Sequence, residues 1–146
     1  MKLASYVVGG KPGFGVVTDE GIIDLADRGV GRSLKHAMAS GSLDKIKEVA
    51  AGLKADLPLA DVEFEPCIPN PGKVFCIGIN YRKHVLEMGR DLPEHPWVFT
   101  RTPDSFVGHD QDLLRPAVSE QFDFEGELAV VIGKTAHRVS ASDALD

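Results

Sequence analysis

The chain has 146 residues, which is enough for one hydrophobic core, or for one small domain plus part of another. Its hydrophobic content of 43% and its charged content of 26% are ordinary for a globular protein and exclude a disordered or fibrous chain. The net charge is -6 and the basic residues are not clustered, which excludes a surface for nucleic acid or anionic membrane and favours a small-molecule ligand.

The two cysteines and the apolar segments indicate the compartment. Cys67 and Cys76 form no CxxC motif and have no histidine at zinc-binding spacing, so we expect two free thiols in a reducing, cytoplasmic environment. The first apolar run, residues 3–8, is too short for a signal peptide and is better interpreted as a strand. No stretch approaches the roughly 20 apolar residues that span a bilayer. We therefore expect a soluble protein.

The first third of the chain predicts a small β-meander followed by two helices. β-rich runs at residues 3–8, 14–18 and 22–25 are separated by glycine-containing turns. Helical patterns cover residues 33–39 and 43–50, with Ser42 as a cap for the second and Gly52 as its stop. His36, in the first helix, has no acidic neighbour three or four residues away and is interpreted as an ordinary helix residue.

A proline-rich segment divides the chain. Residues 65–72 carry three prolines, which forbid a regular element and are typical of a domain linker. We expect a small α+β domain at residues 1–68 and the N-terminal portion of a β-rich domain at residues 69–146. The apolar run at residues 73–79 opens the second domain and predicts a strand that is covered on both faces.

Two carboxylates stand at the head of an apolar run, residues 122–133. In a strand the side chains of Glu125 and Glu127 point to the same face, while Gly126 leaves the other face open. They can converge on a hard cation such as Mg²⁺ or Mn²⁺, which favours about six oxygen ligands, so at least one more carboxylate is expected. The alternative is a strand with an acidic solvent face.

A histidine and a glutamate follow the 73–79 run on a short helical segment. His84 and Glu87 lie at i, i+3, so they share one face and can hydrogen-bond. A carboxylate that holds one ring nitrogen raises the basicity of the other, as a general base requires. The alternative is a surface ion pair on an amphipathic turn.

Several of these motifs occur in series and in the order found in one enzyme family. They are the GINY segment with His84 and Glu87, FTRTP at 99–103, SFVGH at 105–109, Arg115-Pro116, and EGELAVVIG at 125–133. With these motifs the chain resembles the fumarylacetoacetate hydrolase family over residues 73–146. The leader resembles the small N-terminal domain of some bacterial members. The resemblance implies a mixed β-sandwich roll after the leader, and thus an α+β protein.

The resemblance also implies roles for particular residues. Glu125 and Glu127 match two metal-binding carboxylates, and His84 with Glu87 matches a water-activating pair on a mobile lid. Arg101 stands where many members have lysine; it either grips a substrate carboxylate or is an exposed loop residue. Ser105 and His109 either line the pocket or shape the turn, and Ser105 is our second candidate for substrate binding.

The implied activity is a Mg²⁺- or Mn²⁺-dependent hydrolase that cleaves a C–C bond in acylpyruvate-like β-diketo acids through a metal-stabilised enolate, as in aromatic catabolism. The same enolate chemistry serves isomerases, hydratases and decarboxylases of 2-oxo acids, so the reaction type stays open. The resemblance further implies a homodimer as the full-length protein.

The end of the chain departs from the family pattern. Residues 140–143 have capping-box character, but only three residues follow Asp143, too few for a helix. The third metal-binding carboxylate and a substrate-contacting lysine of the family have no counterpart here. We expect a truncated chain that is inactive by itself; the alternative is a complete, non-catalytic remnant or binding module.

Overall fold

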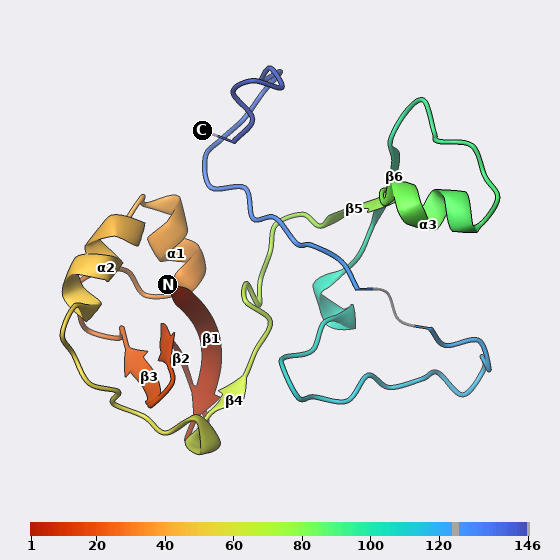
Figure 1. The fold of residues 1–146 in the computed structure, drawn as a ribbon. Coiled ribbons are helices and arrows are strands. Elements are labelled where there is room, and N and C mark those ends of the chain that lie inside the picture. The colour runs from red at the N-terminus through yellow and green to blue at the C-terminus, as the bar shows by residue number, and fades with distance from the viewer. Residues whose placement is uncertain (124–125, 146) are drawn as a thin grey trace.

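The computed structural model describes residues 1–123 and 126–145 and has an α+β fold with antiparallel sheets (Figure 1). The N-terminal region is built on a four-stranded sheet of order β3-β2-β1-β4. Its strands are β1 (Lys2–Val8), β2 (Lys11–Thr18), β3 (Gly21–Asp24) and β4 (Glu63–Phe64). The three-stranded meander predicted from the sequence is confirmed, and the short β4 is an addition to it.

The turn between β1 and β2 depends on two glycines. Gly9 and Gly10 have φ of 55° and 75°, the positive values that a two-residue hairpin turn of the primed type requires. The register that follows runs from Val8 opposite Lys11 to Lys2 opposite Val17. Residues with side chains would be strained at both turn positions, so this glycine pair fixes the hairpin.

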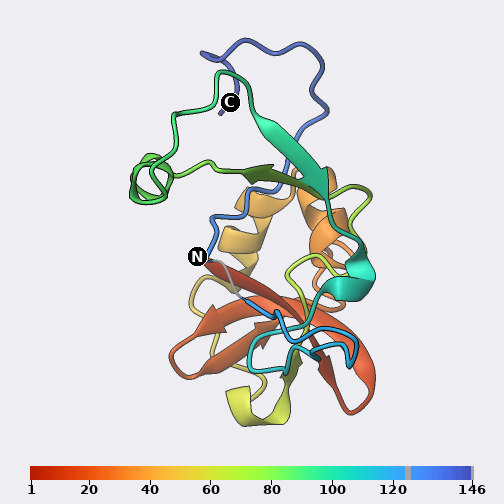
Figure 2. The ribbon, with the colours of Figure 1, turned by 90° about the vertical axis from the view of Figure 1, so that its right-hand side faces the viewer.

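Two helices lie on one side of this sheet and close the core (Figure 2). They are α1 (Leu34–Ala39) and α2 (Leu43–Ala50), as the sequence predicts. Ser33 caps α1, because its side chain accepts a hydrogen bond from the backbone N–H of His36. The core joins both layers; it contains Phe14, Val16, Ile23, Leu25, Val30, Leu34, Ala37 and Ile46.

The predicted cap of α2 is wrong in its detail. Ser42 occupies the N-cap position but its side chain makes no capping hydrogen bond. Its backbone, at φ -84° and ψ 10°, is not extended, and its Oγ lies 2.9 Å from Ser40 Oγ instead. The hydroxyl is therefore satisfied by its neighbour rather than by the helix end.

The proline-rich segment at residues 65–72 contains no regular element, as predicted, but it is fastened to the N-terminal region. A single 3₁₀ turn, η1 (Leu59–Asp61), precedes β4. Ser5 Oγ donates a hydrogen bond of 2.8 Å to the Cys67 carbonyl, and Lys35 Nζ donates to the Asn70 carbonyl. These bonds hold the segment against β1 and α1.

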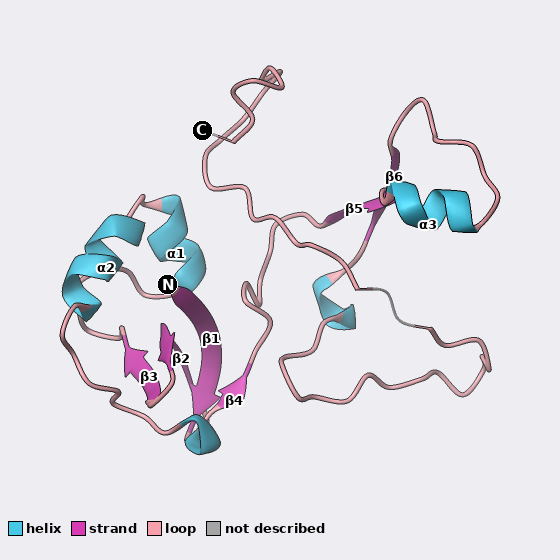
Figure 3. Ribbon diagram, viewed as in Figure 1, coloured by secondary structure: helices cyan, strands magenta, loops and turns pink. Residues whose placement is uncertain are grey.

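The second region has few elements (Figure 3). A two-stranded antiparallel sheet pairs β5 (Phe75–Gly78) with β6 (Trp97–Thr100), and the chain between them forms α3 (Arg82–Glu87). A 3₁₀ turn, η2 (Pro103–Ser105), follows. Among the described residues no helix is long and apolar enough to cross a bilayer.

Two strand predictions for this region are wrong. The run at residues 73–79 forms β5, but the strand is not covered on both faces, because Phe75 is 61% exposed and Ile77 is 39% exposed. Residues 126–133 form no strand. A strand needs a neighbour to take its backbone hydrogen bonds, and the described residues provide none for this run. Residues 141–145 form turns and not a helix.

Candidate functional site

The helix α3 carries the predicted base. It is held in place by Val85, which is fully buried and whose carbonyl accepts from the Arg90 backbone N–H at 3.1 Å. His84 and Glu87 are exposed on this helix. Glu87 Oε1 lies 3.8 Å from Lys83 Nζ, one turn away, and no hydrogen bond joins Glu87 to His84 within the described residues. The two side chains thus share a helix and are open to solvent.

One hydrogen bond connects this helix to the carboxylate segment. The backbone N–H of Leu128 donates to Tyr81 Oη at 3.1 Å, and Tyr81 is the N-cap residue of α3. Glu127, next to Leu128, is exposed. The first predicted ligand, Glu125, lies outside the described residues. The bond brings the segment of the second ligand, Glu127, to the end of the helix that carries His84.

Carboxylates are the donors that a hard divalent cation prefers, so Glu127 and the Glu125 position fit Mg²⁺ or Mn²⁺ in their chemistry. Across residues 1–123 and 126–145, however, no group of three His, Cys, Asp or Glu side chains is arranged to hold a metal. Further ligands would have to come from outside this set.

Arg101 and Ser105 lie on the loop after β6. The guanidinium carbon of Arg101 is 5.3 Å from the centroid of the Phe99 ring, a cation–π contact. Ser105 Oγ donates 2.8 Å to the Thr102 carbonyl and so closes the η2 turn. His109 lies 5.9 Å from Phe64, centroid to centroid, in an edge-on contact. Both Arg101 and Ser105 are exposed to solvent.

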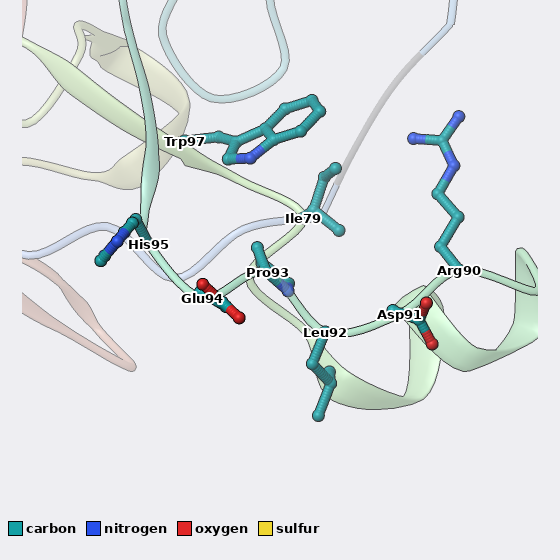
Figure 4. A pocket seen from close by; sticks show the side chains of 8 residues that line it. All are labelled: Ile79, Arg90, Asp91, Leu92, Pro93, Glu94, His95 and Trp97. Atoms are coloured by element: carbon teal, nitrogen blue, oxygen red, sulfur yellow. The ribbon is translucent and has the colours of Figure 1, made fainter.

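An open hollow lies beside the C-terminal end of α3, with a volume of about 630 Å³ (Figure 4). The loop between α3 and β6 forms most of its wall. Its lining residues are Ile79, Arg90, Asp91, Leu92, Pro93, Glu94, His95 and Trp97. None of the residues that the sequence singled out lines it. The signal that could have identified this loop is the sequence of charged residues and prolines between Gly89 and the only tryptophan.

Comparison with known proteins identifies the class of protein. The sequence model described as "Fumarylacetoacetate (FAA) hydrolase C-terminal" matches residues 73–146. The chain therefore belongs to the fumarylacetoacetate hydrolase family, as its motifs predicted.

Three curated proteins are similar to parts of this chain. Oxaloacetate tautomerase YisK of Bacillus subtilis is 50% identical over 93 residues, which are 60% of this chain and 31% of that protein. The human mitochondrial oxaloacetate tautomerase FAHD2A is 31% identical over 146 residues, 97% of this chain and 46% of that protein. A bifunctional isomerase/decarboxylase of homoprotocatechuate catabolism in Escherichia coli is 43% identical over 82 residues, 56% of this chain and 19% of that protein.

A solved structure is similar as well. The crystal structure of a Mycobacterium smegmatis protein assigned as HpcE matches with a TM-score of 0.57 and 28% identity, covering 77% of this chain and 40% of that one. The chain spans less than half the length of each of these relatives. Two of these relatives are named as oxaloacetate tautomerases and one as a bifunctional isomerase/decarboxylase.

Proposed function

We propose that the protein to which this sequence belongs is a Mg²⁺- or Mn²⁺-dependent enzyme that interconverts the keto and enol forms of a 2-oxo acid such as oxaloacetate. The observation that carries the proposal is the Leu128–Tyr81 hydrogen bond, because it joins the Glu127 segment to the helix of His84 and Glu87. The 50% identity to an oxaloacetate tautomerase supports the choice of reaction.

In this reaction a proton leaves the carbon next to the 2-oxo group and another reaches the oxygen. His84 is the proposed base, because the unprotonated nitrogen of a neutral imidazole can accept a proton. Glu87 stabilises the imidazolium when its side chain turns from Lys83 to His84, a rotation that its exposed position permits. Glu125 and Glu127, with further ligands, would hold the cation, which when bound would supply Lewis-acid stabilisation of negative charge on the 2-oxo oxygen.

Arg101 is the proposed anchor for a substrate carboxylate. Its cation–π contact with the Phe99 ring engages the positive charge of the guanidinium and uses none of its N–H groups as hydrogen-bond donors. The donors therefore remain available for a bidentate bond to a carboxylate. Ser105 can contribute its hydroxyl as an acceptor while it donates to Thr102.

The second candidate function is the C–C hydrolysis of acylpyruvate-like acids that the family resemblance implies. It uses the same residues, with His84 taking its proton from water instead of carbon. The exposure of His84 and Glu87, which gives water direct access to both, favours it. Decarboxylation or hydration of a 2-oxo acid would require the same charge stabilisation.

The domain plan is part of this proposal: residues 1–68 form an N-terminal domain, and residues 69–146 begin a mixed β-sandwich roll in a homodimeric protein. The likeness to the HpcE structure supports the roll. So do the exposed apolar side chains of β5 and β6, including Phe75 at 61% and Trp97 at 60%, because a second sheet packed on them would bury this surface.

The test uses the full-length native protein with Mg²⁺ and compares its His84→Ala and Glu87→Gln variants with the wild type. Oxaloacetate enol decay, followed by ultraviolet absorbance, should slow by about 10²–10⁴-fold for His84→Ala, the contribution of a general base. His36→Ala, on the exposed face of α1, is the matched control and should keep wild-type activity. Unchanged turnover in His84→Ala would refute the assignment of the base. Acylpyruvate cleavage without tautomerisation would select the second function.

The cation sites are tested separately. Glu127→Gln should raise the Mg²⁺ concentration needed for half-maximal activity by about tenfold or more, since a carboxylate ligand becomes a neutral one. Glu120→Gln removes another exposed carboxylate close in sequence and should leave the titration unchanged. Equal Mg²⁺ titrations for both variants would exclude Glu127 as a ligand.

A further inference from the structure

Residues far apart in the sequence meet at the outer edge of β4. The side chain of Gln111 contacts three groups there. Its Nε2 donates to Glu63 Oε1 at 2.9 Å and to the Phe64 carbonyl at 3.0 Å, and its Oε1 accepts from the Gly108 backbone N–H at 2.9 Å. One amide side chain thus joins the loop after η2 to an edge strand 47 residues earlier in the chain.

Two neighbours strengthen this contact. The His109 ring meets the Phe64 ring edge-on at 5.9 Å. Gly108 lies so close to β4 that a Cβ added there would overlap the Phe64 carbonyl oxygen. The loop is therefore packed against the strand, and Figure 2 shows it lying against the sheet of the N-terminal region.

The chemistry of the contact requires an amide at position 111. The side chain must donate toward Glu63 and Phe64 and accept from Gly108 at the same time, and glutamine has both a donor and an acceptor end. A glutamate would keep the acceptor, lose both donors and place a second carboxylate beside Glu63.

The contact also fixes one end of the segment that carries Arg101 and Ser105. The other end is fixed where the Arg101 backbone N–H donates to the Val74 carbonyl at 3.4 Å. The seven residues from Arg101 to Val107 are thus held at both ends, once by the residue that precedes β5 and once by the edge of β4. Release of either end would widen the range of positions open to Arg101.

We propose that Gln111 is a positioning residue: it fastens the loop of Arg101 and Ser105 to β4 and so sets the place of the substrate-binding side chains. The contact itself is independent of the reaction. Its effect on substrate binding rests on the proposed function, in which Arg101 holds the substrate carboxylate.

The first test measures hydrogen exchange of the 146-residue chain. In Gln111→Glu, exchange at the Gly108 amide and across residues 101–107 should be about fivefold faster than in the wild type, because both donors to β4 are lost and the loop opens more often. Gln121→Glu is the matched control, because it makes the same charge change at the only other glutamine, whose side chain has no hydrogen bond within the described residues. Combining Gln111→Glu with Glu63→Gln should restore part of the protection, since a donor again faces an acceptor. Wild-type exchange in Gln111→Glu, or equal acceleration in Gln121→Glu, would overturn the contact.

The second test measures kinetics in the native protein. Gln111→Glu should raise KM for the 2-oxo acid about fivefold and leave kcat within about twofold, since it displaces a binding side chain and not the base. Faster exchange with an unchanged KM would overturn the positioning role while leaving the contact in place. If the wild type turns over no 2-oxo acid, the proposed function fails and the exchange experiment still decides the contact.

Discussion

The N-terminal region and the region after residue 72 follow the same rules of sequence patterning but differ in how far they bury their apolar side chains. Among residues 1–123 and 126–145, every buried apolar side chain except that of Val85 lies between Tyr6 and Ile46. After residue 72, by contrast, Leu114, Val118 and Leu128 are exposed by 88%, 97% and 82%. An apolar pattern therefore states what a segment can bury and not whether a partner is present to bury it.

The strongest test of this difference in burial replaces one isoleucine by alanine in each region. Ile46, a residue of α2, is fully buried, and Ile132 is 75% exposed. Ile46→Ala should lower the free energy of unfolding by about 2–5 kcal/mol, because the change removes buried carbons and leaves a cavity. Ile132→Ala should change it by less than about 0.5 kcal/mol. Urea unfolding followed by far-ultraviolet circular dichroism measures both.

Similar losses in the two variants would mean that residues 127–133 are packed in solution as well as Ile46 is. The chain would then have a second core, and the contrast between its regions would disappear. A large loss for Ile46→Ala alone supports the contrast.

A rise to alkaline pH should lower the stability of the N-terminal region. Tyr6 is fully buried and its hydroxyl donates to Asp24 at 2.9 Å. Burial, then the hydrogen bond to Asp24, raise the pKa of Tyr6 above its ordinary value of 10.0. The folded state therefore binds this proton more tightly than the unfolded state does. The resulting stability is present below pH 10 and is lost as the pH rises from there toward the folded pKa.

The variant Tyr6→Phe tests whether Tyr6 causes the alkaline loss of stability. The variant should lose about 1 kcal/mol near neutral pH, where one hydrogen bond is missing, and should show a flatter fall of the free energy of unfolding above pH 10. Tyr81→Phe removes the other tyrosine and leaves the Tyr6–Asp24 pair in place, so it should retain the wild-type alkaline fall. An equally steep alkaline fall in Tyr6→Phe would place the titrating group elsewhere.

Sequence reasoning succeeded where a structure depends on neighbours along the chain. The Gly9–Gly10 turn and the two helices after it need only local signals and a nearby sheet. The same reasoning failed at residues 126–133, because strand formation there depends on a partner strand that no local signal reveals.

In the candidate site, too, local spacing predicted some features, and contacts between distant segments were missed. The placement of His84 and Glu87 on one short helix follows from their spacing, whereas the contacts of Gln111 with Glu63 and Phe64 do not, because they join segments 47 or more residues apart. The link between Tyr81 and Leu128 was missed for the same reason, since its two residues are also 47 positions apart. Spacing identified candidate residues, and only the fold showed which segments meet.

The smallest expected difference is between two serines, Ser33 at the start of α1 and Ser140 in the capping-box sequence near the end of the chain. Ser33 Oγ accepts the His36 backbone N–H at 3.1 Å and begins α1, whereas Ser140 Oγ donates to Asp143 Oδ2 at 2.7 Å in a turn that no helix follows. Ser33→Ala should cost about 1 kcal/mol of unfolding free energy, the usual contribution of a cap, and Ser140→Ala should cost almost nothing. Thermal unfolding of both variants under identical buffer conditions decides between them. A cost for Ser140→Ala that equals the Ser33→Ala cost would mean that residues 140–145 form a helix in solution, because a capping hydroxyl stabilises the protein only where helical backbone N–H groups need an acceptor.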